Sequence, residues 1–320
     1  MGDFNGWGHN KSFQNEGKRI RNSDIWILKA SFPIDARLDY KIIVNGDMWL
    51  IDQLNPYQQW SGVGANSELR MPLWKDDPIH IRNPDVPRGS LSPDILFTSE
   101  ILRYQITFNV YHPYGMDERT PLPVLYVMDG YEYMHPEMGN MLTILDNLYA
   151  EKKIDPIMVV FIDHRDPINR TINRRMEELA MNATYFRFFK EEFLPYIEKN
   201  YSVLSSPEYR AIMGTSVGAL AATYFAFSQP QLFSMAGIQS PSFYLRPQIY
   251  SFCNDPGTTK TKVSMTAGLI NDSSEGSQKM KEILASNSCE YTYREVNEGH
   301  SWGNWRNLID DILIDLFAIK

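Results

Sequence analysis

The residues with the clearest chemical pattern lie between positions 208 and 220, around one serine. The run from Gly214 to Gly218 reads GTSVG, which is the G-x-S-x-G spacing of a nucleophile elbow. The apolar run 209–213 before it predicts a buried strand, and the run 219–227 after it predicts a helix. A nucleophile on such a turn sits in strained backbone, so its neighbours two residues away must lack a Cβ. The pattern predicts Ser216 as a nucleophile, although a Gly-flanked serine also occurs in ordinary strand–helix connections.

A serine hydroxyl needs a base, and that base needs a carboxylate to orient it. Only one histidine follows Ser216 in the sequence, His300, which lies in a turn directly after the predicted strand 291–296. The acid is expected after the strand 263–267, where Asp272 is preferred because a short side chain near the strand end reaches Nδ1 of the histidine. Glu275 is the alternative, and either carboxylate could instead belong to a helix N-terminus. Glu298 is expected to point away from His300.

An oxyanion hole requires two backbone N–H donors. One is expected from Val217, directly after the nucleophile, and the other from Gly130 or Tyr131, in the loop after the strand 122–128. The substrate is expected to contact the side chains of Asp129, His135 and Trp302. No partner stands at metal-ligand spacing from His135, so the sequence predicts no metal and no cofactor.

These residues need a scaffold, and from about residue 91 strands alternate with helices. An antiparallel entry pair is predicted at 91–99 and 102–111. The further predicted strands are 122–128, 157–162, 209–213, 233–240, 263–267 and 291–296, and the predicted helices are 140–152, 183–199, 219–227, 276–286 and 304–318. This alternation predicts an α/β fold, a doubly wound and mostly parallel sheet over residues 91–320, with its chemistry at the carboxyl ends of the strands.

The first 72 residues have strand patterns with no helical period. Strands are predicted at 24–32, 38–44 and 48–52, and Asn45-Gly46 between the last two is a strong hairpin signal. These strands predict a small β-sandwich over residues 1–72, whose glycine-rich exit loop 58–67 leans over the cleft of the second domain. Residues 73–90 form the expected linker, with a short strand near 79–81.

The N-terminal motifs also carry a family resemblance. GDFNGW (2–7), YKIIVNG (40–46) and WLID (49–52) look like an early-set immunoglobulin-like domain of the glycogen-binding-module type, with its first strands lying upstream of Met1. In that family exposed tryptophans can bind glucan, which makes candidates of Trp7, Trp26, Trp49 and Trp60. Core and interdomain packing is the preferred role for them.

Motifs in the second domain resemble those of a known enzyme family. YVMDG (126–130), RMEEL (175–179), FKEEFLPYI (189–197), MGTSVG (213–218) and EGHSWGNWR (298–306) occur in order. Together they look like the esterase family of α/β-hydrolases that contains enterochelin esterases, feruloyl esterases, S-formylglutathione hydrolases and mycolyltransferases. The resemblance covers about residues 89–320. It implies an α/β-hydrolase fold and a serine carboxylic-ester hydrolase.

Two departures from the family pattern bear on the substrate. Ala219 stands where the family often has glycine, which helix packing should tolerate, and Asn271-Asp272 stands where enterochelin esterases often carry Glu-Pro. The second departure ranks a feruloyl or acetyl ester on a carbohydrate above a siderophore trilactone. Arg170, Arg174 and Glu178 are expected to form an ion pair, either facing the substrate or structural, and the structural role is preferred.

Composition bears on the class of protein, its partners and its compartment. The 320 residues are 43% hydrophobic and 22% charged with a net charge of −8, which suits a globular protein and argues against nucleic acid as a partner. No apolar run reaches transmembrane length, and Cys253 and Cys289 predict neither a disulfide framework nor a metal site. The compartment stays open: the chain as it stands predicts the cytoplasm, and a signal peptide removed upstream would predict secretion or the periplasm. Oligomeric state is open too.

A hypothesis of a different class is a catalytically inactive carbohydrate-binding protein. The presence of Ser216, His300 and a carboxylate in the order expected of the α/β-hydrolases argues against it.

Overall fold

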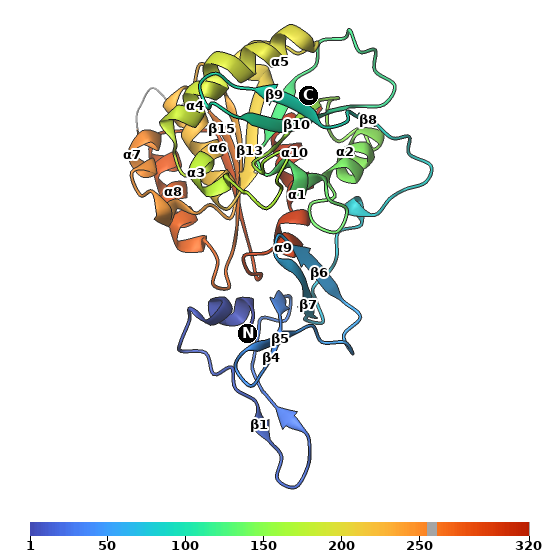
Figure 1. Cartoon of the computed structure of the whole chain (residues 1–320), viewed down its shortest axis with the longest axis vertical. Helices are drawn as coiled ribbons and strands as arrows, with labels where there is room; N and C mark the ends of the chain where they lie inside the picture. The colour runs from blue at the N-terminus through green and yellow to red at the C-terminus, as the bar shows by residue number, and fades with distance from the viewer. Residues whose placement is uncertain (255–260, 320) are drawn as a thin grey trace.

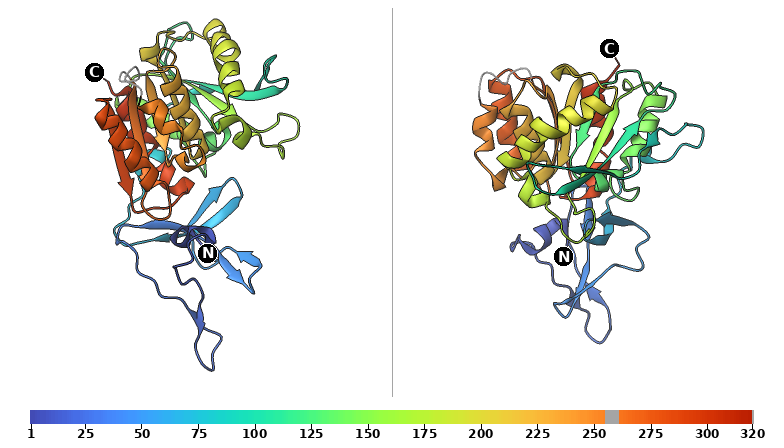
Figure 2. Two further views of the ribbon diagram at one scale, coloured as in Figure 1. Left: turned by 90° about the vertical axis from the view of Figure 1, so that its left-hand side faces the viewer. Right: turned by 45° about the horizontal axis from the view of Figure 1, so that its top comes forward.

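The computed structural model describes residues 1–254 and 261–319 (Figure 1). An α/β domain holds the green to red part of the chain, and a β-rich N-terminal region, in blue, lies against one end of it (Figures 1 and 2). No helix in the described part of the chain is both long enough and apolar enough to cross a membrane.

Within the described residues, nine strands form one sheet in the order β16-β15-β14-β13-β11-β12-β10-β8, and β9 also pairs with β10. The strands are β8 (Ser90–Leu91), β9 (Ile95–Thr98), β10 (Gln105–His112), β11 (Val124–Val127), β12 (Met158–Asp163), β13 (Arg210–Thr215), β14 (Met235–Gln239), β15 (Lys262–Gly268) and β16 (Tyr291–Val296). Strands β11 to β16 are parallel, whereas β10 is antiparallel to β8, β9 and β12. The predicted doubly wound sheet with its antiparallel entry pair is confirmed.

The central strands are apolar throughout because helices cover both faces of the sheet. On β11, Tyr126 packs into one hydrophobic cluster, and Leu125 and Val127 pack into the other. The first cluster includes residues of α6 (Val217–Ser228) and of the helical stretch 183–200, and the second includes residues of α2 (Met141–Ala150) and α10 (Ile309–Phe317). Besides α4 and α5 in the stretch 183–200, the other α-helices of the described residues are α1 (Gly130–Met134), α3 (Arg175–Leu179), α7 (Ile249–Cys253), α8 (Ser274–Ser286) and α9 (Trp302–Arg306).

The helix predicted at 183–199 is present but irregular. It consists of α4 (Ala183–Phe188), a π-helical turn (Phe189–Phe193) and α5 (Leu194–Asn200). Asn182 caps its start, since its Oδ1 accepts hydrogen bonds from the backbone N–H groups of Thr184 and Tyr185. Pro195 has no N–H to give to the preceding turn, which accounts for the irregularity there.

The N-terminal region contains small antiparallel sheets. Strands β3 (Arg37–Tyr40), β7 (Gly64–Arg70) and β6 (Gln58–Ser61) form one, and β1 (Lys18–Arg19) with β2 (Trp26–Ile27) forms a second. Strands β4 (Ile42–Val44) and β5 (Met48–Leu50) form the predicted hairpin, in which Asn45 and Gly46 take positive φ values of 57° and 87°. The assignment of this region to the early-set class stays a prediction.

The single helix predicted at 304–318 is divided into α9 and α10. Three local expectations before residue 82 were also wrong. The strand predicted at 24–32 shrinks to Trp26–Ile27, and the strand predicted at 38–44 breaks at Lys41, whose N–H donates to the carbonyl of Met1. Residues predicted as a strand at 79–81 fall largely in a 3-10 helix, Pro78–His80. Asp77 caps that turn by accepting from the N–H of Ile79, and a proline at the first position favours a helical start.

Candidate active site

Ser216 lies at the tight connection between β13 and α6. Its backbone has φ 59° and ψ −117°, in the positive-φ region that side chains disfavour. A Cβ on Gly214 would lie 2.4 Å from the carbonyl carbon of Gly218, so this turn closes only because residue 214 is a glycine. A Cβ on Gly218 would instead meet Asp129 Oδ2 at 2.8 Å. The serine is therefore held at the carboxyl end of a central strand and at the N-terminus of a buried helix.

The side chains of Ser216, His300 and Asp272 form a continuous hydrogen-bonded line. His300 Nε2 lies 2.9 Å from Ser216 Oγ, and His300 Nδ1 lies 2.6 Å from Asp272 Oδ1. The second carboxylate oxygen of Asp272 accepts hydrogen bonds of 2.6 Å from the Ser240 hydroxyl and of 2.6 Å from the Gly268 N–H. Asp272 is thus fixed from both sides, and the arrangement can move a proton from the serine hydroxyl to the imidazole.

Glu275, the alternative acid, lies elsewhere. It is exposed in the first turn of α8, while Asp272 precedes that helix and contacts the imidazole. A second hydroxyl also stands beside the serine: Ser242 Oγ lies 3.1 Å from Ser216 Oγ. Ser240 and Ser242 follow β14, and neither was singled out from the sequence.

The candidates for the two oxyanion donors, Val217 and either Gly130 or Tyr131, lie at the starts of two helices. Val217 is the first residue of α6, and Gly130 and Tyr131 are the first two residues of α1. The first N–H groups of a helix have no intrahelical partners, so they are free to receive negative charge. The helix starts are close together, since a Cβ on Gly218 would lie 2.8 Å from Asp129 Oδ2.

Asp129 was expected to contact substrate, but its carboxylate is engaged inside the protein. Arg175 donates to it twice, from Nε at 2.6 Å and from Nη2 at 2.7 Å, and the same Nη2 also donates to the carbonyl of Thr215 at 3.0 Å. A buried carboxylate requires such a partner. The pair ties the start of α1 and the elbow to α3, which is a structural role in place of the expected substrate contact.

Trp302 is likewise placed away from solvent. Its side chain is only 2% exposed, donates from Nε1 to Glu132 Oε2 at 2.8 Å, and packs edge-on against Tyr133 and Trp305. Trp302 is the first residue of α9 and comes two residues after His300, so its buried contacts anchor the end of the loop that carries the histidine.

The other predicted pocket residues lie nearer the surface. Tyr131 is 40% exposed, with the guanidinium carbon of Arg165 3.5 Å from its ring centroid. His135 is partly exposed, and its ring centroid lies 5.8 Å from that of Tyr131. These two side chains remain candidates for substrate contact.

The expected ion pair among Arg170, Arg174 and Glu178 does not form. Arg170 bonds Asp163 and Asp94, and Arg174 bonds Asp166. Glu178 is buried and instead bonds His164 and Tyr104. The sequence spacing of Arg170, Arg174 and Glu178 therefore did not identify the groups that each of them bonds.

We expect Arg175→Met to destabilise the protein by about 3 kcal/mol, because it leaves the Asp129 carboxylate buried without a countercharge. Urea unfolding measures the loss. The double variant Asp129→Asn/Arg175→Met removes both charges and should recover most of it. Equal stability of the two variants would contradict this account of the pair.

Glu298 points away from His300, as expected. Its Oε1 accepts a hydrogen bond of 2.9 Å from Trp74 Nε1, and its Oε2 lies 3.8 Å from Arg37 Nη1. Burial raises the pKa of Glu298 to about 7 from 4.5, although Arg37 and the Trp74 hydrogen bond act in the opposite direction.

This raised pKa predicts a pH-dependent stability. Between pH 4.5 and about 7 the folded protein holds a proton on Glu298 that the unfolded chain has lost. The contribution of Glu298 to the free energy of unfolding is therefore complete below pH 4.5 and is lost as the pH rises through about 7. The group should remove up to about 3 kcal/mol of unfolding free energy over that range. Urea unfolding at several pH values should show a smaller decline for Glu298→Gln than for the wild type. Equal declines would contradict the assignment.

Comparisons with known proteins identify the family and proteins of similar fold. The family model described as "Putative esterase" matches residues 99–263, more than half of the chain. The uncharacterized protein YjcH of Bacillus subtilis is 24% identical over 239 residues, which cover 71% of this chain and 98% of that protein. An endo-1,4-beta-xylanase/feruloyl esterase of Xylanibacter ruminicola is 26% identical over 93% of this chain, which spans only 41% of that protein.

Among solved structures, the ferric enterobactin esterase of Salmonella typhimurium is similar in fold. Its TM-score is 0.77 at 20% sequence identity, over 94% of this chain and 83% of that one. Coverage of 94% leaves few residues unmatched, so the similarity in fold extends over most of the N-terminal region as well as the α/β domain. The family match, the α/β-hydrolase sheet and the position of the serine elbow lead to one conclusion: the chain belongs to the "Putative esterase" family.

Proposed function

We propose that the chain is a serine carboxylic-ester hydrolase that works through an acyl-enzyme. Ser216 is the nucleophile, His300 the general base and Asp272 the residue that orients and stabilises the imidazole. The observation that carries the proposal is the hydrogen-bonded line from Asp272 through His300 to a serine in an elbow turn. Membership of an esterase family supports the reaction class.

In the proposed reaction, Ser216 Oγ attacks the ester carbonyl while its proton passes to His300 Nε2. The carbonyl oxygen becomes negative and accepts hydrogen bonds from the N–H of Val217 and from that of Gly130 or Tyr131. Each such donor is worth about 3 kcal/mol of transition-state stabilisation. The imidazolium then protonates the leaving alcohol. A water molecule, deprotonated by the same histidine, releases the acid and restores the serine.

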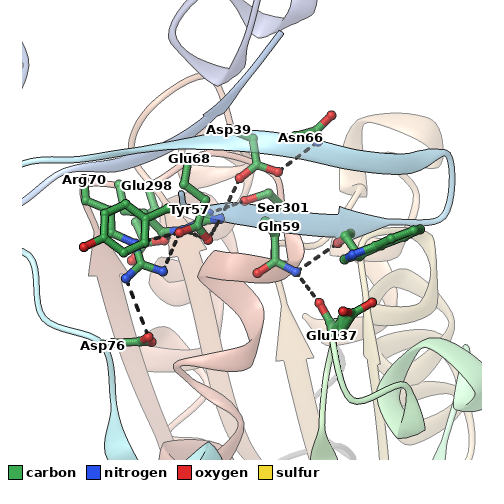
Figure 3. Close-up of polar contacts among 12 residues, drawn as sticks. Asp39, Tyr57, Gln59, Asn66, Glu68, Arg70, Asp76, Glu137, Glu298 and Ser301 are labelled. Carbon is green, nitrogen blue, oxygen red and sulfur yellow. Dashed lines mark hydrogen bonds and ion pairs between the residues drawn. The ribbon is translucent and has the colours of Figure 1, made fainter. Parts of the chain in front are cut away.

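We place the ester on a carbohydrate, with a feruloyl or acetyl group as the acyl part. The feruloyl-esterase relative supports this assignment, since the similarity to it extends over the N-terminal region as well as the catalytic domain. The site also offers an aromatic surface at the exposed ring of Tyr131. The β6–β7 hairpin lies beside it: Gln59 Nε2 donates to the Glu137 carbonyl at 2.7 Å (Figure 3), and a Cβ on Gly62 would lie 2.8 Å from Glu132 Oε1.

A siderophore trilactone is the second candidate, because the ferric enterobactin esterase shares the fold over 94% of this chain. Parallel assays of methyl ferulate, acetylated xylan and ferric enterobactin, with Ser216→Ala as the blank, distinguish the substrates. We expect turnover of at least one of the first two. If the protein hydrolyses only ferric enterobactin, the substrate is a siderophore trilactone and not a carbohydrate ester.

Two general probes of esterase chemistry test the hypothesis that the protein is an inactive carbohydrate-binding protein. p-Nitrophenyl acetate reports esterase chemistry whatever the natural substrate, and a fluorophosphonate should label Ser216. If the folded protein neither hydrolyses the ester nor takes the label, the proposed hydrolase activity is wrong.

A further inference from the structure

The loop that carries His300 is held from outside the catalytic domain. Residues 297–301 connect β16 to α9, and the N-terminal region contacts this loop on both sides of the histidine. The N–H of Arg37 donates to the carbonyl of Asn297 at 3.3 Å, and Arg37 Nη1 donates to Ser301 Oγ at 3.0 Å. Asn297 Nδ2 also donates to Asp35 Oδ1 at 2.8 Å.

Arg37 is completely buried, and its position is strongly determined. Its Nε and Nη2 donate to Glu68 Oε1 at 3.1 and 2.6 Å, and Nη2 also donates to Asp39 Oδ1 at 2.6 Å. In Figure 3, Asp39 and Glu68 project from the light-blue N-terminal strands, and Glu298 and Ser301 of the loop 297–301 lie close to them. A buried guanidinium with this many carboxylate partners has one favourable placement.

Glycines in the His300 loop and at the start of α9 leave space for side chains of the N-terminal region. A Cβ on Gly303 would lie 1.8 Å from Arg37 Cζ, so the guanidinium rests directly on the backbone at the start of α9. A Cβ on Gly299, the residue before His300, would lie 2.3 Å from the side chain of Asp3. Two glycines beside the histidine therefore accommodate side chains of the N-terminal region.

The N-terminal region also holds the loop of the acid. Asn271, the residue before Asp272, donates from Nδ2 to the Asp3 carbonyl at 2.9 Å and accepts from Asn10 Nδ2 at 3.0 Å. Asp3 is itself fixed, because its Oδ2 accepts from the N–H of Asp39 at 2.8 Å. The segments bearing Asp272 and His300 thus rest on the same few N-terminal residues.

We propose that Arg37 is a positioning residue, which through Ser301 fixes the loop of His300 in register with Ser216 and Asp272. The N-terminal region then acts as part of the catalytic apparatus. Arg37 is fully buried and cannot touch a substrate, so its effect should fall on kcat more than on KM. Displacement of a catalytic group by about 1 Å costs roughly 100-fold in rate. This inference rests on the proposed hydrolase function.

The test uses the full chain and three variants. Ser301→Ala removes the hydroxyl that Arg37 contacts on the loop while leaving the buried charges intact, and Arg37→Lys keeps the charge but loses the fork of donors. Arg70→Met is the matched control, since Arg70 bonds the same Glu68 from the other side and, within the described residues, donates to none of residues 297–301. Circular dichroism and urea unfolding establish that each variant is folded.

We expect Ser301→Ala and Arg37→Lys to lower kcat for p-nitrophenyl acetate about 10- to 100-fold with KM changed less than about threefold. Arg70→Met should keep kcat within about threefold. Folded Ser301→Ala and Arg37→Lys variants with wild-type kcat would overturn the inference. So would an equal loss in Arg70→Met, because that result would indicate a general effect of stability.

A second readout does not depend on turnover. The proton on His300 Nδ1, bonded to Asp272, should give a far-downfield ¹H NMR resonance that His300→Ala removes. We expect Ser301→Ala and Arg37→Lys to shift or broaden this resonance, and Arg70→Met to preserve it. If the wild type hydrolyses no ester, the proposed function fails while the resonance still tests the position of His300. An unchanged resonance in both loop variants would overturn the positioning role.

Discussion

Replacing Ser216 by alanine is expected to lower kcat for p-nitrophenyl acetate by about 10⁵-fold or more, since loss of a nucleophile of this type removes the acyl-enzyme route altogether. The reaction left over would come from the helix N-termini and from substrate binding. Release of p-nitrophenol measures the loss, and fluorophosphonate labelling should disappear with it. The variant should fold, because alanine keeps the Cβ that serine already carries at φ 59°.

Ser242→Ala provides the matched control for this experiment. Its hydroxyl lies 3.1 Å from Ser216 Oγ, so the variant loses the same group from the same site without losing the proposed nucleophile. We expect its kcat to stay within about tenfold of the wild type. A Ser216→Ala variant that retains more than a few percent of the activity would contradict the mechanism. A greater loss in Ser242→Ala than in Ser216→Ala would assign the attack to Ser242.

The sheet could be predicted from the sequence because its central strands are buried on both faces. Runs such as 122–128 and 157–162 are apolar throughout, and each is followed directly by an aspartate at the carboxyl edge of the sheet. The choice of Ser216 as the proposed nucleophile followed from the steric needs of the elbow, since a Cβ at 214 or 218 would lie 2.4 or 2.8 Å from neighbouring atoms. With a single histidine downstream of Ser216, the choice of base required no knowledge of the fold.

The expected roles of Asp129 and Trp302 depended on which way each side chain turns, which sequence position does not determine. Asp129 follows a central strand, the usual place for a pocket residue, but Arg175 lies 46 positions further along the chain and engages its carboxylate. Trp302 stands two residues from His300 and is buried, because the start of α9 directs it toward Tyr133. Both residues support the site from the inside.

The contacts of Arg37 could not be predicted, because they join residues 264 positions apart. Arg37 directly precedes the predicted strand 38–44, and nothing in the sequence there distinguishes it from an arginine at the surface of a β-rich region. The glycines at 299 and 303 were visible, but the side chains that occupy the space above them belong to the N-terminal region. These contacts make the N-terminal region and the two catalytic loops one structural unit.

Replacing Asp272 by asparagine is expected to lower kcat by about 10⁴-fold, and the hydrogen bonds of the carboxylate explain why. Oδ2 accepts from both the Ser240 hydroxyl and the Gly268 N–H, so an amide NH₂ at that position would face the N–H donor of Gly268. The asparagine should therefore turn its NH₂ toward His300 Nδ1. The imidazole would then carry its proton on Nε2, where it cannot accept one from Ser216.

Glu275→Gln is the matched control, because it makes the same chemical change at an exposed carboxylate three residues further along the chain. We expect its kcat to remain within about threefold of the wild type, with both variants folded by circular dichroism. A loss of kcat in Glu275→Gln together with near-normal turnover in Asp272→Asn would reverse the assignment of the acid. If Asp272→Asn alone loses turnover and its downfield Nδ1 proton resonance, the wrong tautomer is the cause, since an unprotonated Nδ1 has no proton to observe.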